Sequence, residues 1–107
     1  QRHPKEHGTT YKCTDLIVDS NRKSVTRNGI DIELSPKEYA ILEYMIRNKN
    51  IALSRSQIEA NAWEIDFDGE SNIIDVYIRY LRKKIDDGFE TKLIQTVRGI
   101  GYMLKEA

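Results

Sequence analysis

The feature that most constrains this chain is an apolar stripe in residues 72–86. Ile74, Ile78, Leu81 and Ile85 recur every three or four residues, and on a helix they fall within about 60° of one another. A helix with such a stripe has to bury that side against other elements. Its opposite side carries Asn72, Val76, Arg79 and Lys83. The segment therefore predicts an amphipathic helix with a cationic outward face.

Both ends of this helix are marked by capping residues in the sequence. Ser71 is a favourable N-cap, and Gly88 follows the last apolar position as a C-cap. Two strand-like runs then surround the sequence Arg98-Gly99-Ile100-Gly101, whose glycines suit a tight turn. Residues 93–104 are therefore expected to form a β-hairpin.

Two more helices are predicted upstream by capping boxes. In the first, Ser35 caps the helix, Pro36 suits the first helical position and Glu38 closes the box. This helix is expected to end near Asn48. Its buried arc is predicted to hold Tyr39, Ile41, Leu42, Met45 and Ile46. Ser54 and Gln57 form the second box, which opens a shorter helix to about residues 62–63.

The N-terminal third is typical of short strands. Asn28-Gly29 lies between two β-branched runs and is a strong hairpin signal, because both positions of a type I′ turn need positive φ. Residues 11–34 are thus expected to form an antiparallel sheet of three or four strands. Residues 1–10 are polar and aperiodic, and we interpret them as a flexible linker remnant.

The order of these elements predicts one α+β domain over residues 11–107. An N-terminal antiparallel β-sheet, three helices and a C-terminal β-hairpin are the layout of a winged helix-turn-helix. In that interpretation the helix over about residues 72–86 enters the DNA major groove, and the hairpin over about residues 93–104 is the wing. The alternative to a DNA-reading helix is that Arg79, Arg82, Lys83 and Lys84 simply form a solvent-exposed helix face.

Charge distribution supports an anionic partner although the formal net charge is zero. Residues 1–30 carry six Lys or Arg and three Asp or Glu, and residues 71–107 carry seven and five. The stretch 31–70 carries four and nine. Because a partner responds to local potential, two basic ends around an acidic middle remain compatible with nucleic-acid binding.

Several site classes are disfavoured. Cys13 is the one cysteine, which excludes an internal disulfide and a cysteine-rich zinc site and is simplest in reducing cytosol. His3 and His7 stand four apart beside Pro4 and Gly8, a poor context for a metal-binding helix. No nucleophile–base pair with supporting context is recognisable, so neither an enzyme nor a cofactor is expected.

Four motifs in order resemble OmpR/PhoB-type response regulators. Residues 72–85 are similar to that family's recognition helix and residues 94–102 to its wing. The matches to its first and second helices are residues 34–39, 54–58 and 62–63. The similarity covers about residues 11–105, and it implies a C-terminal DNA-binding effector domain of a two-component transcription regulator.

The resemblance also implies roles for individual residues. Val76 and Tyr80 are the candidates for base contacts, although many relatives carry a basic residue at the position of Tyr80. The candidates for backbone contacts on the helix are Asn72, Tyr77, Arg79, Arg82 and Lys83. The other DNA-contact candidates are Arg55, Trp63, Thr96, Arg98 and Tyr102. The alternatives are rim packing for the two tyrosines, core packing for Trp63 and a solvated turn for Arg98.

Partners are implied by the same resemblance. The loop carrying Glu64, Asp66, Phe67, Asp68 and Glu70 would face an alpha or sigma subunit of RNA polymerase, with a variable solvated loop as the alternative. A receiver domain absent from this chain would be phosphorylated by a sensor histidine kinase. Two effector domains would then bind direct promoter repeats head to tail as a homodimer, whereas the isolated domain would be monomeric. The location would be cytoplasmic.

Two rival functions remain. One is a winged helix that binds protein through Val76, Tyr77 and Tyr80, and the other is a small enzyme. The operator, the regulated genes, the inducing signal, the cognate kinase and the choice between activation and repression do not follow from the sequence.

Overall fold

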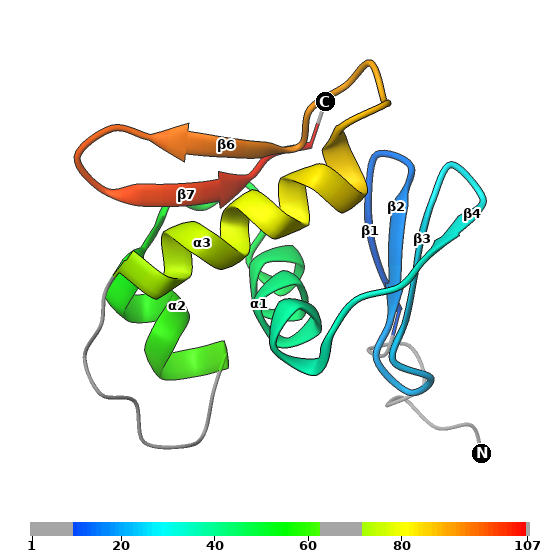
Figure 1. The fold of residues 1–107 in the computed structure, drawn as a ribbon, viewed down its shortest axis with the longest axis horizontal. Helices are drawn as coiled ribbons and strands as arrows, with labels where there is room; N and C mark the ends of the chain where they lie inside the picture. Colours follow the sequence, from blue (N-terminus) through cyan, green and yellow to red (C-terminus); the bar gives the residue numbers. More distant parts are fainter. Residues whose placement is uncertain (1–9, 63–71, 107) are drawn as a thin grey trace.

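A computed structural model describes residues 10–62 and 72–106 of the chain. The elements run from a four-stranded sheet through three helices to a hairpin that belongs to a second sheet, as Figure 1 shows. The winged helix-turn-helix predicted from the sequence is confirmed. Across the described ranges, no helix is long and apolar enough to cross a membrane.

The N-terminal sheet is antiparallel and follows the order β1-β2-β3-β4. Its strands are β1 (Thr10–Cys13), β2 (Leu16–Asp19), β3 (Ser24–Arg27) and β4 (Ile30–Ile32). Asn28 and Gly29 have φ values of 55° and 79°, which confirms the turn predicted between β3 and β4. Thr10 was expected in the linker, but it pairs with Asp19 as the first residue of β1.

The helices begin where the capping boxes predict. Helix α1 (Pro36–Arg47) starts after Ser35, whose side chain accepts a hydrogen bond from the Glu38 backbone while the Glu38 carboxylate accepts one from Ser35. The reciprocal pair of Ser54 and Gln57 starts α2 (Arg55–Ala62) in the same way. The predicted buried arc of α1 is confirmed in full.

The third helix differs from the prediction at its C-terminal end. Regular α-helix α3 (Asn72–Leu81) continues into a wider π-helical turn, η2 (Arg82–Asp86), closed by the Asp87 amide donating to the Arg82 carbonyl. The sequence predicted uniform helix to about residue 86. Periodicity still placed the buried stripe correctly, since three of its four members precede the wider turn and Ile85, within that turn, is buried as well. The expected N-cap, Ser71, lies outside the described residues.

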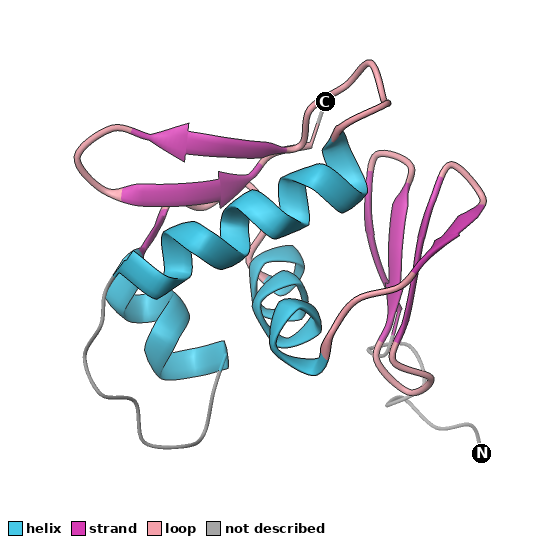
Figure 2. Cartoon of the chain, in the orientation of Figure 1, coloured by secondary structure: helices cyan, strands magenta, loops and turns pink. Residues whose placement is uncertain are grey.

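The wing is a hairpin of β6 (Ile94–Val97) and β7 (Gly101–Leu104). A short strand, β5 (Leu53–Ser54), pairs with β7 and completes a three-stranded sheet in the order β5-β7-β6. Sequence analysis did not predict β5, because two residues carry no periodicity. Helix α3 runs alongside the hairpin in Figure 2, while α1 contacts both other helices.

Arg27 joins the two sheets through the end of the third helix. Its side chain, 1% exposed, pairs with Asp15 at 2.6 Å and with Asp86 at 3.1 Å, and it donates to the Ile85 carbonyl. The Asp86 carboxylate also accepts hydrogen bonds from the backbone of Leu93 and Ile94, which lead into the wing. This link holds η2 at a fixed place between the N-terminal sheet and β6.

Candidate nucleic-acid interface

The buried stripe of the third helix determines which of its side chains face outward. Ile74, Ile78, Leu81 and Ile85 are all at most 1% exposed, as the spacing predicted. The opposite face therefore stands free of the core. Its exposed residues are Arg79, Tyr80, Lys83 and Lys84. Val76, on the same face, is half-buried.

The four basic residues of this helix split into two groups. Within residues 10–62 and 72–106, neither Arg79 nor Lys83 has an ion-pair or hydrogen-bond partner for its side chain. In contrast, Lys84 pairs with Glu38 at 2.7 Å, and Arg82 donates to the Thr96 hydroxyl at 2.7 Å. Among these four residues, Arg79 and Lys83 therefore have their full donor capacity available, whereas Arg82 and Lys84 are already held by protein contacts.

Two tyrosines form the rim beside this basic face. Tyr80 is 43% exposed, whereas Tyr77 is half-buried and packs against the core. Their rings meet edge to face with centroids 5.7 Å apart, a favourable aromatic geometry. Tyr77 therefore limits the orientations of Tyr80, which stays exposed.

A cluster of Arg55, Asp75 and Tyr102 lies where α2, α3 and the wing meet. Arg55 donates through Nε to Asp75 at 2.7 Å, and the Tyr102 hydroxyl donates to the same carboxylate oxygen. Burial would raise the pKa of Asp75, but the hydrogen bonds from Tyr102 and Arg55 bring it below its ordinary value. Burial and then the Asp75 carboxylate raise the pKa of Tyr102. At neutral pH the centre is therefore an ionised carboxylate that holds a neutral phenol and a guanidinium.

The wing carries its exposed groups along β6 and at the turn. Thr96 and Arg98 are both exposed. Gly99 has a φ of +80°, which allows the tight turn next to Arg98. Tyr102, predicted to contact DNA, is only 6% exposed and its hydroxyl is engaged by Asp75. Its side chain is therefore largely buried and its hydroxyl already has a partner, while its predicted contact with DNA stays a prediction.

Not every predicted residue can be located. Asn72 is the first residue of α3. Trp63 and the acidic loop residues Glu64, Asp66, Phe67, Asp68 and Glu70 lie outside the described residues. The sequence analysis assigned no role to Asp75, which lies in the first turn of α3. The signal was an acidic residue among basic ones, which is unfavourable on an anion-binding face unless it is paired.

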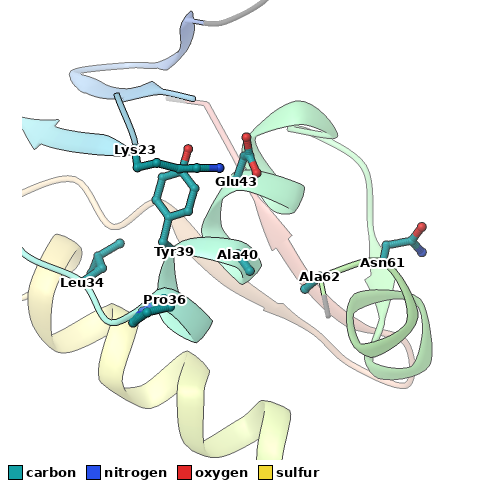
Figure 3. A pocket seen from close by; sticks show the side chains of 8 residues that line it. All are labelled: Lys23, Leu34, Pro36, Tyr39, Ala40, Glu43, Asn61 and Ala62. Atoms are coloured by element: carbon teal, nitrogen blue, oxygen red, sulfur yellow. The ribbon is translucent and has the colours of Figure 1, made fainter. Parts of the chain in front are cut away.

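One cleft lies apart from the basic face. It has a volume of about 590 Å³ and is bordered by the β2–β3 turn, α1 and the end of α2 (Figure 3). Its lining is Lys23, Leu34, Pro36, Tyr39, Ala40, Glu43, Asn61 and Ala62. Burial, followed by the neighbouring Glu43 carboxylate, raises the pKa of Tyr39 to about 12. The phenol is therefore protonated at neutral pH and is a poor general base.

Comparison with known families gives a match over most of the chain. The family model described as "Transcriptional regulatory protein, C terminal" matches residues 29–104. The transcriptional regulatory protein CusR of Escherichia coli K12 is 47% identical over 95 residues, covering 89% of this chain and 42% of CusR. PcoR of Escherichia coli is 44% identical over 105 residues, covering 98% and 46%. The chain thus spans less than half the length of these relatives.

Solved structures agree with this match. The RstA DNA-binding domain from Klebsiella pneumoniae, in complex with the RstA box, superposes with a TM-score of 0.77 at 28% identity, over 90% of this chain and 96% of that one. The response regulator DrrB from Thermotoga maritima, an OmpR/PhoB homologue, superposes with a TM-score of 0.78 at 28% identity, over 91% and 44%.

Proposed function

Since this chain belongs to the family of C-terminal domains of transcriptional regulatory proteins, of the OmpR/PhoB type, we propose that it binds double-stranded promoter DNA as the effector domain of a two-component response regulator. The family consists of transcription regulators and is not enzymatic. The observation that carries the proposal is the pair of exposed cations on the third helix, Arg79 on α3 and Lys83 on η2, whose side chains have no ion-pair or hydrogen-bond partner in the described part of the chain.

In this proposal the third helix and the wing contact different grooves of the DNA. Helix α3 enters the major groove, where Val76 and Tyr80 meet base edges and thymine methyl groups. Arg79 and Lys83 contact the phosphates, with Asn72, Tyr77 and Arg82 beside them. Arg98, exposed next to the wing turn, reaches the adjacent minor groove, whose negative potential favours arginine. Arg55, Thr96 and Trp63 complete the proposed backbone contacts.

The remaining partners concern the whole regulator. A receiver domain, phosphorylated by a sensor histidine kinase, would promote pairing of two effector domains head to tail on direct repeats. One module of this size buries roughly 600–1,000 Å² of protein surface, which predicts weak binding by a monomer. The acidic loop between α2 and α3 is proposed to contact an alpha or sigma subunit of RNA polymerase. Promoter binding would place the protein in the cytoplasm.

A salt-titrated binding assay tests the proposal. We expect the chain to bind duplex DNA with an affinity that falls steeply as salt rises, because each neutralised phosphate contributes about −0.9 to the log–log slope. The double substitution Arg79→Ala/Lys83→Ala should flatten that slope by up to about 1.8, since two phosphate contacts are lost. The measurement is fluorescence anisotropy with a labelled duplex at several salt concentrations.

The matched control removes two exposed positive charges elsewhere. Arg22 lies before β3 and Arg47 ends α1, and both are exposed and distant in sequence from α3 and the wing. Arg22→Ala/Arg47→Ala should leave the slope nearly unchanged. If both double variants behave alike, the assignment of α3 as the DNA-reading element is wrong. An affinity for duplex DNA that does not change with salt would favour the rival function, in which the winged helix binds a protein through Val76, Tyr77 and Tyr80.

A further inference from the structure

The Asp75 carboxylate is an anomaly on a surface proposed to bind phosphates. It lies in the first turn of α3 and its side chain is 38% exposed. A carboxylate there repels DNA through the charge that it carries. Its contacts show what it does instead, since it holds Arg55 of α2 by a 2.7 Å ion pair and accepts a hydrogen bond from the hydroxyl of Tyr102 on β7.

Tyr102 in turn contacts two guanidinium groups. The Cζ atom of Arg55 is 5.5 Å from the centroid of its ring, and the Cζ atom of Arg82 is 5.6 Å away. Both distances fit cation–π attraction. Arg82 is further restrained by hydrogen bonds to the Thr96 hydroxyl at 2.7 Å and to the Ile94 carbonyl at 3.3 Å. One ring therefore restrains arginines from two different helices.

These contacts leave donor capacity for a partner. Arg55 uses Nε for Asp75, and its side chain is still 43% exposed. A guanidinium carries five N–H donors in a rigid fork that matches phosphate oxygens. Ordering a long side chain during association weakens binding, and ordering it beforehand removes that loss.

We propose that Asp75 and Tyr102 are positioning residues, which hold Arg55 and Arg82 in advance as paired donors to the DNA phosphate backbone. Neither positioning residue needs to touch DNA. The inference rests on the proposed DNA-binding function and deepens it, because it explains why a carboxylate is retained on the interface. It also assigns the wing a second task, the support of Arg55 on α2 and Arg82 on η2.

The decisive experiment neutralises the carboxylate. If Asp75 positions Arg55, then Asp75→Asn weakens binding to a 24-base-pair duplex of mixed sequence by about tenfold, the scale of one hydrogen bond to a charged group. If Asp75 merely competes with DNA for Arg55, removing its charge tightens binding, which overturns the inference. Asp87→Asn is the matched control, because Asp87 is exposed and lines the groove beside Arg82 and Thr96. This control should bind at least as tightly as the unsubstituted chain.

A double-mutant cycle separates positioning from general destabilisation. Arg55→Ala should weaken binding in the unsubstituted chain but have little further effect in Asp75→Asn, since the two residues act as one unit. Additive losses would contradict the inference. The exchange rate of the Arg55 Nε–H proton, measured by NMR without DNA, should rise in Asp75→Asn while the remaining arginine signals stay unchanged.

The variant Tyr102→Phe provides a second test of the inference if the Asp75→Asn variant fails to fold. It retains the ring and removes only the hydroxyl bond to Asp75, so it should weaken duplex binding less than Tyr102→Leu, which also removes the ring. If Tyr102→Phe, Tyr102→Leu and the unsubstituted chain bind the duplex equally well, the inference is overturned while the proposed DNA-binding function still stands. Failure of the unsubstituted chain to bind any duplex would instead overturn the proposed function and the inference with it.

Discussion

Gly99 and Gly101 lie two residues apart in the wing, but the structure needs them for different reasons. Gly99 has a φ of +80° with open space where a side chain would point. Gly101 has no left-handed φ, and a Cβ atom on it would collide with the Leu53 carbonyl oxygen. From the sequence both glycines were expected to have only a geometric role, and the close pairing of β5 with β7 makes Gly101 the more constrained of the two.

Replacing each glycine by alanine should separate these two causes. Gly101→Ala forces β5 and β7 apart, and overpacking of this kind lowers the free energy of unfolding by about 1–3 kcal/mol. Gly99→Ala meets only the left-handed backbone penalty, about 1–2 kcal/mol. Thermal or urea unfolding measures both. A Gly101→Ala variant as stable as the unsubstituted chain would show that β5 is not held closely against the wing.

For the basic side chains of the third helix, sequence periodicity predicted the orientation but not the partners. Periodicity placed Arg79, Arg82, Lys83 and Lys84 away from the apolar stripe, which is correct. It treated them as one class, whereas Arg82 and Lys84 are engaged by the wing and by α1. Those partners lie 14 and 46 residues away in sequence, so helical spacing carries no information about them.

At the scale of elements, the start of α1 and the end of the third helix are joined through Glu38. This side chain accepts from the Ser35 amide at 2.8 Å and from Lys84 at 2.7 Å, while being only 6% exposed. Burial would raise the pKa of Glu38, but the hydrogen bonds from Lys84 and Ser35 lower it below its ordinary value. The capping box predicted from the sequence is thus also a tertiary contact.

This lowered pKa predicts an acid-sensitive contribution to stability. A depressed carboxyl pKa stabilises the fold above the unfolded-state pKa, and the contribution is lost as pH falls through the folded-state value. Glu38→Gln should therefore lower the free energy of unfolding by about 1–3 kcal/mol at pH 7. Its difference from the unsubstituted chain should shrink as pH falls below about 4. Urea unfolding across pH 3–7 measures this.

The lysine partner provides the control for the same contact. Lys84→Met should reproduce part of the Glu38→Gln effect, whereas Lys83→Met, at an exposed neighbouring position without a partner in the described residues, should not. A Glu38→Gln variant that keeps the full pH dependence of stability would mean that another carboxylate is responsible.

For the whole molecule, the buried Arg27 connects the N-terminal sheet to the end of the third helix and to the segment that leads into the wing. It reaches Asp15, Asp86 and the carbonyl of Thr91, and its guanidinium also lies 4.5 Å from the Phe89 ring centroid. Removing one partner of a buried ion pair leaves the other without compensation. We expect Arg27→Leu to lower the free energy of unfolding by about 3–5 kcal/mol.

The matched substitution is Arg22→Leu at an exposed position, which should stay within about 0.5 kcal/mol of the unsubstituted chain. Chemical denaturation followed by circular dichroism measures both variants. A loss below 1 kcal/mol for Arg27→Leu would show that the two sheets are joined mainly by apolar packing rather than by this arginine.

Local sequence rules were enough to predict the order of the elements other than β5, the two capping boxes, the Asn28-Gly29 turn and the buried stripe of the third helix. These features depend on residues within a few positions of one another, so local rules of spacing and backbone geometry suffice. The same rules identified the outward face that carries Arg79 and Lys83.

Which charged groups already have a partner became clear from the folded chain alone. Arg27 and Asp86 are 59 residues apart, and Tyr102 and Asp75 are 27 apart. Strand β5 likewise exists only because β7 lies beside it. A side chain's availability to a partner depends on what chain folding brings next to it, and that proximity is created by packing of the whole core rather than by any local pattern.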